Sequence, residues 1–337
     1  MRHYGARIND RYKHDNLRVL ILENELVRVT VRLDLGADIT ELLFKPRDVD
    51  FLWHRPGVLP GSPRRIPTSF NNRPFFDYYE GGWQELFPHA SAASQYIGAE
   101  LGFHGETWGL PWEYKILADE PGVVSVKLWV RTLRMPFLLE RVMSLHSGEP
   151  VLRMHETVTN EGKKTLDFMW GHHPAVGPPF LDEGCVLDAP ARRIRLGDSL
   201  QPWPVDGSGR DHSRLVRESS STEVMKYLHD LDEGWVAVTN PKMQVGVGFV
   251  FDPAVFDCVW LWHEFGYTQE YPWFGRAYVL GVEPMSSLPG AREAGGRLLR
   301  LEGESSLETD FLTVVYEGKG VKGISQAGAV TPRTSES

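Results

Sequence analysis

The stretch LVRVTVRLD, residues 26–34, decides the fold class of this 337-residue chain. Val27, Val29, Val31 and Leu33 alternate with charged or hydroxyl-bearing residues, which is the period of two expected of a strand with one dry face. Short connectors such as HSGEP (146–150) are typical of hairpins. The same alternation recurs in residues 123–132, 138–146, 151–160, 234–240, 245–252, 277–284 and 307–316. Because no segment shows a sustained helical stripe, we expect an all-β, antiparallel sandwich.

The strands follow one another too evenly to suggest a domain boundary. We therefore expect a single β-sandwich domain over residues 1–317. The remaining residues, 318–337, are small and polar, and such a composition predicts a disordered C-terminal tail.

Composition narrows the class of partner. A net charge of −9 disfavours nucleic acid, because binding to phosphates needs a basic surface. The two cysteines, Cys185 and Cys258, give neither a disulfide framework nor a zinc motif. No apolar run is long enough to predict a membrane span, and the first residues lack the apolar core of a signal peptide. We expect a cytoplasmic protein that binds a small molecule without nucleic acid, membrane or cofactor. Monomer and homodimer both stay open.

Three regions interrupt the strand pattern. Residues 54–113, 170–215 and 263–276 are rich in proline, glycine and aromatic residues. Long loops on a β scaffold are where binding and catalytic sites are usually built. We therefore expect these three regions to converge on one site.

Histidines and one glutamate are the candidate chemical groups in these regions. In FMWGHHPAVGPP (168–179), His172 and His173 are adjacent, so an extended backbone would direct only one of them into a given pocket. Glu283 is the first acidic residue of an apolar strand and directly precedes a proline; a buried carboxylate is costly unless it is paired or used. His104 lies between glycines and aromatics in GFHGETWGLPW. Each residue alone also fits a packing or surface role.

Tryptophans supply a further indication. Seven of them lie in or beside the irregular regions, and indole faces pack well against the C–H faces of sugar rings. Aromatic residues are also ordinary core residues, so this composition only favours a carbohydrate ligand. The seven are Trp83, Trp108, Trp112, Trp170, Trp260, Trp262 and Trp273.

Across about 300 residues the chain resembles the aldose 1-epimerases, or galactose mutarotase-like proteins. FHGETWGLPWEY (103–114) is similar to the family's HG…LPWEV element, VTNEGKKTLDFMWGHHPAVG (158–177) to its V-x-N…H-P-Y-F-N-L element, and VLGVEPMSSLPGA (279–291) to its EP…PDA end motif. The opening residues 22–53 also look like the family's start. Two departures, Trp108 in place of an arginine and AVGPP after His173, indicate a divergent subfamily with an altered substrate.

The resemblance implies a β-supersandwich and an aldose 1-epimerase (mutarotase) that interconverts α and β anomers without a metal. It implies that Glu283 is the base, that His173 is the acid and that His104 stabilises charge near the anomeric centre. Positioned proton transfers of this kind are each worth about 10²–10⁴-fold. Substrate contacts are expected from Arg73, Trp83, His172, Trp262 and His263.

Three other interpretations stay open at this stage. A carbohydrate lyase or hydrolase would share the fold, and a glycosidase would need a second carboxylate such as Glu85, Glu106 or Glu264. His104, His173 and Glu283 could also form a three-ligand metal site. Finally, the chain could be a non-catalytic sugar-binding protein on the same fold.

Overall fold

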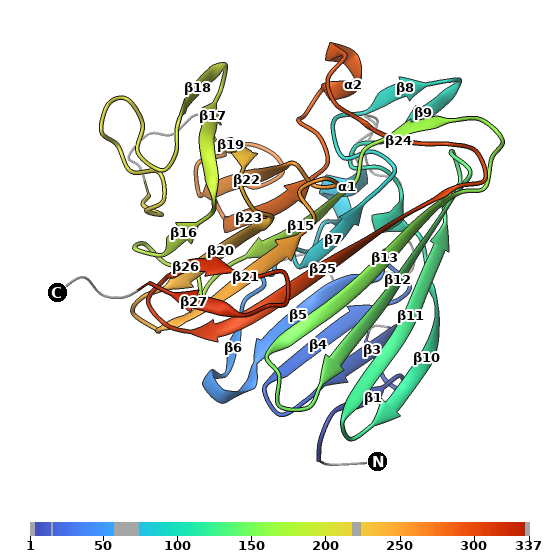
Figure 1. Ribbon diagram of the computed structural model, residues 1–337, viewed down its shortest axis with the longest axis horizontal. Coiled ribbons are helices and arrows are strands. Elements are labelled where there is room, and N and C mark those ends of the chain that lie inside the picture. Colours follow the sequence, from blue (N-terminus) through green and yellow to red (C-terminus); the bar gives the residue numbers. More distant parts are fainter. Residues whose placement is uncertain (1–3, 15, 57–73, 218–223, 334–337) are drawn as a thin grey trace.

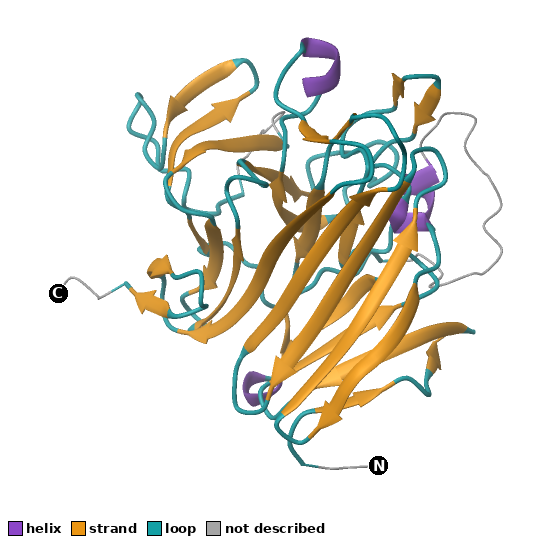
Figure 2. Ribbon diagram, turned by 45° about the vertical axis from the view of Figure 1, so that its right-hand side comes forward, coloured by secondary structure: helices purple, strands orange, loops and turns teal. Residues whose placement is uncertain are grey.

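The computed structural model describes residues 4–14, 16–56, 74–217 and 224–333, and two large antiparallel sheets dominate them (Figure 1). Figure 2 shows that helices contribute only short pieces. These are α1 (Pro74–Tyr78), α2 (Ala291–Ala294) and the 3₁₀ turns Lys45–Arg47 and Thr107–Gly109. None of the helices in these ranges is long and apolar enough to cross a membrane. The expected all-β, antiparallel sandwich is confirmed.

The first sheet carries the strands on which the candidate site is built. Within the described ranges its 13 strands follow the order β1-β3-β4-β5-β7-β15-β23-β22-β19-β17-β18, with β2 paired to β3 and β6 to β5. Their bounds are β1 Arg7–Asn9, β2 Lys13–His14, β3 Leu17–Glu23, β4 Val27–Arg32, β5 Asp38–Phe44, β6 Val49–Asp50, β7 Trp83–Leu86, β15 Gly171–Val176, β17 Ala191–Leu196, β18 Ser199–Pro202, β19 Met225–Leu231, β22 Cys258–Phe265 and β23 Tyr278–Met285.

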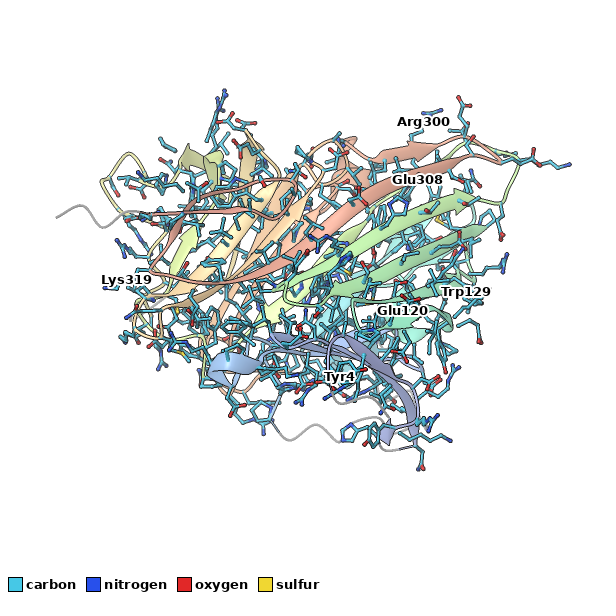
Figure 3. The ribbon with its side chains drawn as sticks, turned by 60° about the horizontal axis from the view of Figure 1, so that its bottom comes forward. Tyr4, Glu120, Trp129, Arg300, Glu308 and Lys319 are labelled. Carbon is cyan, nitrogen blue, oxygen red and sulfur yellow. The ribbon has the colours of Figure 1, made fainter. Side chains whose placement is uncertain are left out.

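The second sheet lies against the first and has one solvent face. Along β12 buried and half-buried positions alternate without a break, as the sequence predicts. Side chains on the outer face, such as those of Trp129 and Glu308, project away from the molecule (Figure 3). The order is β10-β11-β12-β13-β25-β21-β20-β16, with bounds β10 Glu113–Glu120, β11 Val123–Arg131, β12 Phe137–His146, β13 Val151–Asn160, β16 Val186–Asp188, β20 Trp235–Asn240, β21 Val245–Phe251 and β25 Ser306–Glu317.

The main core lies between the two sheets, and a second apolar cluster lies on the opposite face of the first sheet. Alternate residues of β15, β22 and β23 therefore point either into the main core or into this second cluster. On β22, for example, Leu261 belongs to the main core and Trp262 to the second cluster. Every residue of β15 and β22 is consequently buried.

Two expectations about irregular structure were wrong. Residues 170–215 contain β15 to β18. Of these, β15 and β16 are buried on both faces and so lack the alternation that marks a half-exposed strand. The expected disorder of residues 318–337 fails for the described part, which ends at residue 333. There β26 (Val321–Ile324) and β27 (Val330–Pro332) form a hairpin. Two further ribbons pair β8 (Ser94–Tyr96) with β9 (Ala99–Leu101) and β14 (Leu166–Phe168) with β24 (Leu299–Leu301).

Candidate functional site

A cavity of about 340 Å³ opens on the face of the first sheet that carries the second apolar cluster. This volume lies within the range of about 300–1,000 Å³ that is typical of small-molecule pockets. The walls are mainly aromatic and come from β19, β22, α1 and the loops around them. The aromatic side chains are Phe75, Phe76, Tyr79, Phe103, Tyr227, Trp260, Trp262 and Trp273.

The three residues expected to be catalytic, His104, His173 and Glu283, all line this cavity. His173 comes from β15 and Glu283 from β23, which are hydrogen-bonded neighbours in the first sheet. The imidazole Nε2 of His173 lies 3.4 Å from Oε1 of Glu283. Both side chains are almost completely buried. The structure therefore brings the imidazole of His173 and the carboxyl of Glu283 together in the wall of one cavity.

The local sequence of β23 makes room for this pair. Gly281 precedes Glu283 by two residues and so points to the same face of the sheet. A Cβ at position 281 would lie 2.4 Å from the carboxylate Oε1 of Glu283 and 3.0 Å from Cβ of Trp262. Only a residue without a side chain lets the carboxylate occupy its place.

Burial favours the neutral forms of both members of the pair. Desolvation raises the pKa of Glu283 well above its ordinary value. Desolvation also lowers the pKa of His173 to about 4. Both shifts favour an uncharged carboxyl beside an uncharged imidazole.

The imidazole of His104 is oriented so that its Nε2 can accept a hydrogen bond. Its Nδ1 lies 2.9 Å from the carbonyl oxygen of Ala90 and must donate to it, because a carbonyl only accepts. Burial lowers the pKa of His104 well below its ordinary value, so Nε2 is unprotonated at neutral pH. The expectation that His104 stabilises developing charge near the anomeric centre stays a prediction. In this geometry the Nε2 lone pair is available to accept a hydrogen bond from a hydroxyl.

The five expected substrate contacts have different positions. Trp262 lines the cavity. Trp83 and His172 face the main core instead, where His172 contacts Phe311 of β25 with ring centroids 4.1 Å apart. His263 lies between Trp262 and Glu264 on β22 and points to the opposite face from both. These three are corrections imposed by strand alternation, and Arg73 lies outside the described residues.

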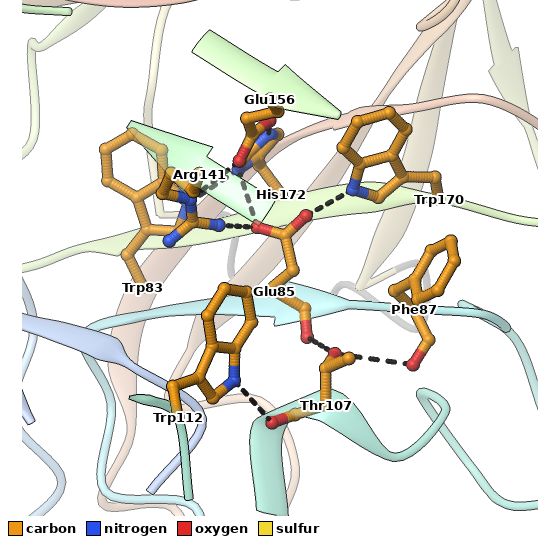
Figure 4. A network of polar contacts seen from close by, with 9 residues as sticks. All are labelled: Trp83, Glu85, Phe87, Thr107, Trp112, Arg141, Glu156, Trp170 and His172. Carbon is orange, nitrogen blue, oxygen red and sulfur yellow. Dashed lines mark hydrogen bonds and ion pairs between the residues drawn. The ribbon is translucent and has the colours of Figure 1, made fainter. Parts of the chain in front are cut away.

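A buried polar network holds His172 behind the site (Figure 4). His172 Nε2 lies 3.0 Å from Glu156, while its Nδ1 accepts from the Trp83 indole at 3.2 Å. The guanidinium of Arg141 pairs with both Glu156 and Glu85. Burial opposes the charge on Glu156, but the neighbouring His172 and Arg141 lower its pKa to about 2.

The same network contains the atoms that most resemble a metal site among the described residues. One ligand atom each from Glu85, Glu156 and His172 lie within 4.8 Å of one another. Because Arg141 already forms ion pairs with both carboxylates, the donor set is better explained as a buried ionic network. The network anchors β15 from one side, which leaves the next residue, His173, facing the cavity.

Sequence reasoning missed several cavity residues. Tyr79 follows α1 directly, and Trp273 lies in the third irregular region. Gln84 is paired directly opposite His173 in the β7–β15 ladder and so shares its face. Aromatic residues in proline-rich loops were visible in the sequence, but only the fold selects which of them reach the cavity.

Comparisons with known proteins agree with this fold. The chain is similar to a "putative aldose 1-epimerase" from Klebsiella pneumoniae, with 17% identity, a TM-score of 0.75 and coverage of 93% of this chain and 84% of that one. The Slr1438 protein from Synechocystis has 18% identity and a TM-score of 0.67, and the match covers 92% of this chain and 99% of that one. A galactose mutarotase-like protein from Clostridium acetobutylicum has 12% identity and a TM-score of 0.64, and the match covers 93% of this chain and 99% of that one. At such identities the likeness shows the fold alone.

Sequence comparison supplies the family. A search of curated protein sequences finds no match. Residues 14–312, most of the chain, match the family described as a domain of unknown function, DUF4432. The match spans His104, His173 and Glu283 and leaves out only β1, the start of β2 and the end of β25 from the two large sheets. On this evidence from sequence, fold and site together, the chain belongs to the DUF4432 family and has the galactose mutarotase-like fold.

Proposed function

We propose that this protein is an aldose 1-epimerase-like isomerase that interconverts the α and β anomers of a sugar. The observation that carries the proposal is the buried pair of Glu283 and His173, 3.4 Å apart at the base of an aromatic cavity. The structural neighbours described as aldose 1-epimerases and mutarotase-like proteins support it through the shared fold.

The reaction needs one base and one acid. The base takes the proton from the C1 hydroxyl while the acid protonates the ring oxygen, so the C1–O5 bond breaks and an aldehyde forms. Rotation about C1–C2 and closure on the other face reverse both proton transfers, and no atom is gained or lost. Glu283 as base and His173 as acid fulfil these roles, and each transfer contributes about 10²–10⁴-fold.

The pKa shifts decide which group acts first. While the carboxyl is protonated and the imidazole is uncharged, Glu283 donates to the ring oxygen and His173 accepts from the C1 hydroxyl. Once the carboxyl is ionised and the imidazole is protonated, Glu283 is the base and His173 is the acid. Because the two directions of mutarotation exchange the roles of acid and base, both arrangements are used. A pKa moved toward neutrality also makes the carboxylate of Glu283 a stronger base once it is ionised.

The remaining cavity residues position the ring. The Nε2 lone pair of His104 accepts a hydrogen bond from a sugar hydroxyl, and Trp262 with its aromatic neighbours packs against C–H faces. Arg73 stays a proposed contact.

The carboxylates argue against a two-carboxylate glycosidase. Glu264 also lines the cavity, but its Oε1 accepts from the backbone N–H groups of Tyr267 and Thr268 at 2.7 and 3.0 Å. The hydroxyl of Thr268 also donates to Glu264 Oε2, so this carboxylate is already engaged by its own loop.

The test is anomer exchange measured by NMR on a panel of aldoses and aldose derivatives. We expect accelerated exchange for at least one sugar and a fall of about 10²–10⁴-fold in Glu283→Gln, which keeps the shape of the side chain. Glu308→Gln, on the exposed face of β25, is the matched control and should keep full activity. Sugar binding without exchange would identify a non-catalytic binding protein, and a cleaved product would identify a hydrolase or lyase.

A further inference from the structure

Tyr79 combines deep burial with an unused hydroxyl. Its side chain is 3% exposed, lines the cavity and packs among Phe75, Trp262 and Trp273. Within the described ranges its hydroxyl has no hydrogen-bond partner. A buried phenol ordinarily finds one, so an unused hydroxyl in a cavity wall points to a ligand.

Two more unused polar atoms lie on the same side of the first sheet. Gln84 is directly opposite His173 in the β7–β15 ladder, so the two side chains share the cavity-facing side. The Gln84 amide nitrogen donates to Asp38 and to the carbonyl of Gly81, but its Oε1 has no partner in the described part of the chain. The same holds for Nδ1 of His173.

The Tyr79 ring packs directly against His173, which pairs with Glu283. It lies edge-on to the His173 imidazole, with ring centroids 5.4 Å apart and an interplanar angle of 87°. A phenol hydroxyl donates, an amide oxygen accepts, and a sugar hydroxyl does both. A ligand that carries a hydroxyl group would therefore give the unpaired Tyr79 hydroxyl a hydrogen-bond partner.

We propose that Tyr79 is a specificity-determining residue whose hydroxyl donates a hydrogen bond to one substrate hydroxyl beside His173. The inference rests on the proposed function for the identity of the ligand as a sugar. It assigns to Tyr79 the choice between sugars that carry this hydroxyl and sugars that lack it.

The ionisation of Tyr79 suits a permanent donor. Burial raises the pKa of the phenol well above its ordinary value, and the nearby carboxyl of Glu283 raises it further. The O–H therefore persists over the whole pH range in which a sugar would be bound. Sites built to bond a hydroxyl discriminate strongly against analogues without it, because the protein groups are then left unpaired.

Tyr79→Phe removes only the hydroxyl and keeps the ring that packs against Trp262 and Trp273. Sugar binding is followed by tryptophan fluorescence and anomer exchange by NMR, for the best aldose of the panel and each of its monodeoxy analogues. We expect wild type to prefer the parent sugar over one deoxy analogue by about 10-fold or more. Tyr79→Phe should lose a similar factor on the parent sugar and lose the preference over that analogue alone.

Tyr316→Phe is the matched control, because it removes a buried hydroxyl that bonds Thr239 at 2.8 Å in the second sheet. Binding and discrimination should be unchanged in this variant. Retention by Tyr79→Phe of the full wild-type preference over every deoxy analogue would overturn the inference while leaving the proposed function intact. Sugar binding without anomer exchange in wild type would overturn the proposed function, and the binding arm would still decide the role of Tyr79.

Discussion

Two adjacent histidines occupy different environments because neighbouring residues of a strand point to opposite faces. The sequence predicted that only one of them could face the pocket, and His173 does so, while His172 is enclosed in the ionic network. Which face lies outward could not be derived from the residues themselves. The resemblance supplied that choice through the His-Pro pair, and the two sheets supply its physical basis.

Substitution separates the two histidines. His173→Gln should lower anomer exchange by about 10²–10⁴-fold with little loss of stability, because an amide cannot transfer the proton. His172→Gln should instead lower the unfolding temperature, since the amide cannot match both Glu156 and Trp83, and should cost less in kcat. Thermal unfolding and NMR exchange measured on both variants check this, and the reverse pattern would assign the acid to the wrong histidine.

Burial of Glu283 links its charge to stability. Its pKa in the folded protein lies above the ordinary 4.5, so the folded state keeps a proton that the unfolded chain has already lost. That contribution to stability is complete below pH 4.5 and is lost as the pH rises through the folded pKa. The side chain introduced by Glu283→Gln does not titrate. The unfolding temperature of this variant should therefore rise relative to that of wild type as the pH is raised from about 5 to about 8. Calorimetry at both pH values measures this change, and exposed Glu308→Gln should show no such trend. An unfolding temperature of Glu283→Gln that falls relative to wild type as the pH rises would contradict the expectation.

Among the elements, the half-exposed strands of the second sheet were predicted from their alternation. The strands buried on both faces divide, because β20, β21 and β23 were predicted and β15 and β22 were not. β11, β12 and β13 show clear alternation in the sequence, and the structure places strands there. The sequence did not predict β15 and β22, because both faces of each strand are covered, one by the main core and one by the second apolar cluster. Of the two strands that carry the pair, the sequence predicted β23 with Glu283 and missed β15 with His173.

The ionic network under β15 should be essential to that strand. Arg141→Met leaves Glu85 and Glu156 buried without their shared cation, which typically costs about 3–5 kcal/mol. Adding Glu85→Gln and Glu156→Gln to the same variant should restore part of the loss, because the uncompensated charges are then removed. Denaturant unfolding measures both variants.

Arg131→Met provides the matched control for Arg141→Met. Arg131 pairs with Glu161 at 2.8 Å on the solvent-exposed end of β11, so its loss should leave the unfolding midpoint nearly unchanged. Equal effects at positions 131 and 141 would show that the buried network contributes no more than an exposed ion pair.

At the scale of the whole molecule, the disorder predicted from composition was wrong for the described C-terminal residues. Their polar, glycine-rich sequence predicted disorder, yet the β26–β27 hairpin covers the outer face of the second sheet. Val321 and Ile324 pack there beside Trp235 and Leu312. Gly248 of β21 makes the fit, because a Cβ at that position would lie 2.2 Å from Cδ1 of Ile324. Two apolar residues in a polar segment suffice when the sheet offers them a matching surface.

Removal of the hairpin should therefore affect stability and leave the site intact. A chain ending at Glu317 loses the cover over the apolar cluster and both partners of the buried Asp188, the Val321 N–H at 3.0 Å and the Arg333 guanidinium. We expect a lower unfolding temperature and binding of an apolar dye to the uncovered face.

Sugar binding and anomer exchange per folded molecule should nevertheless equal those of the full chain, because the cavity belongs to the opposite face of the first sheet. A chain ending at Arg333 retains the hairpin and serves as the control. Loss of binding in the shorter chain well below its unfolding temperature would show that the two faces are coupled. An unchanged unfolding temperature would show instead that the hairpin contributes nothing to the fold.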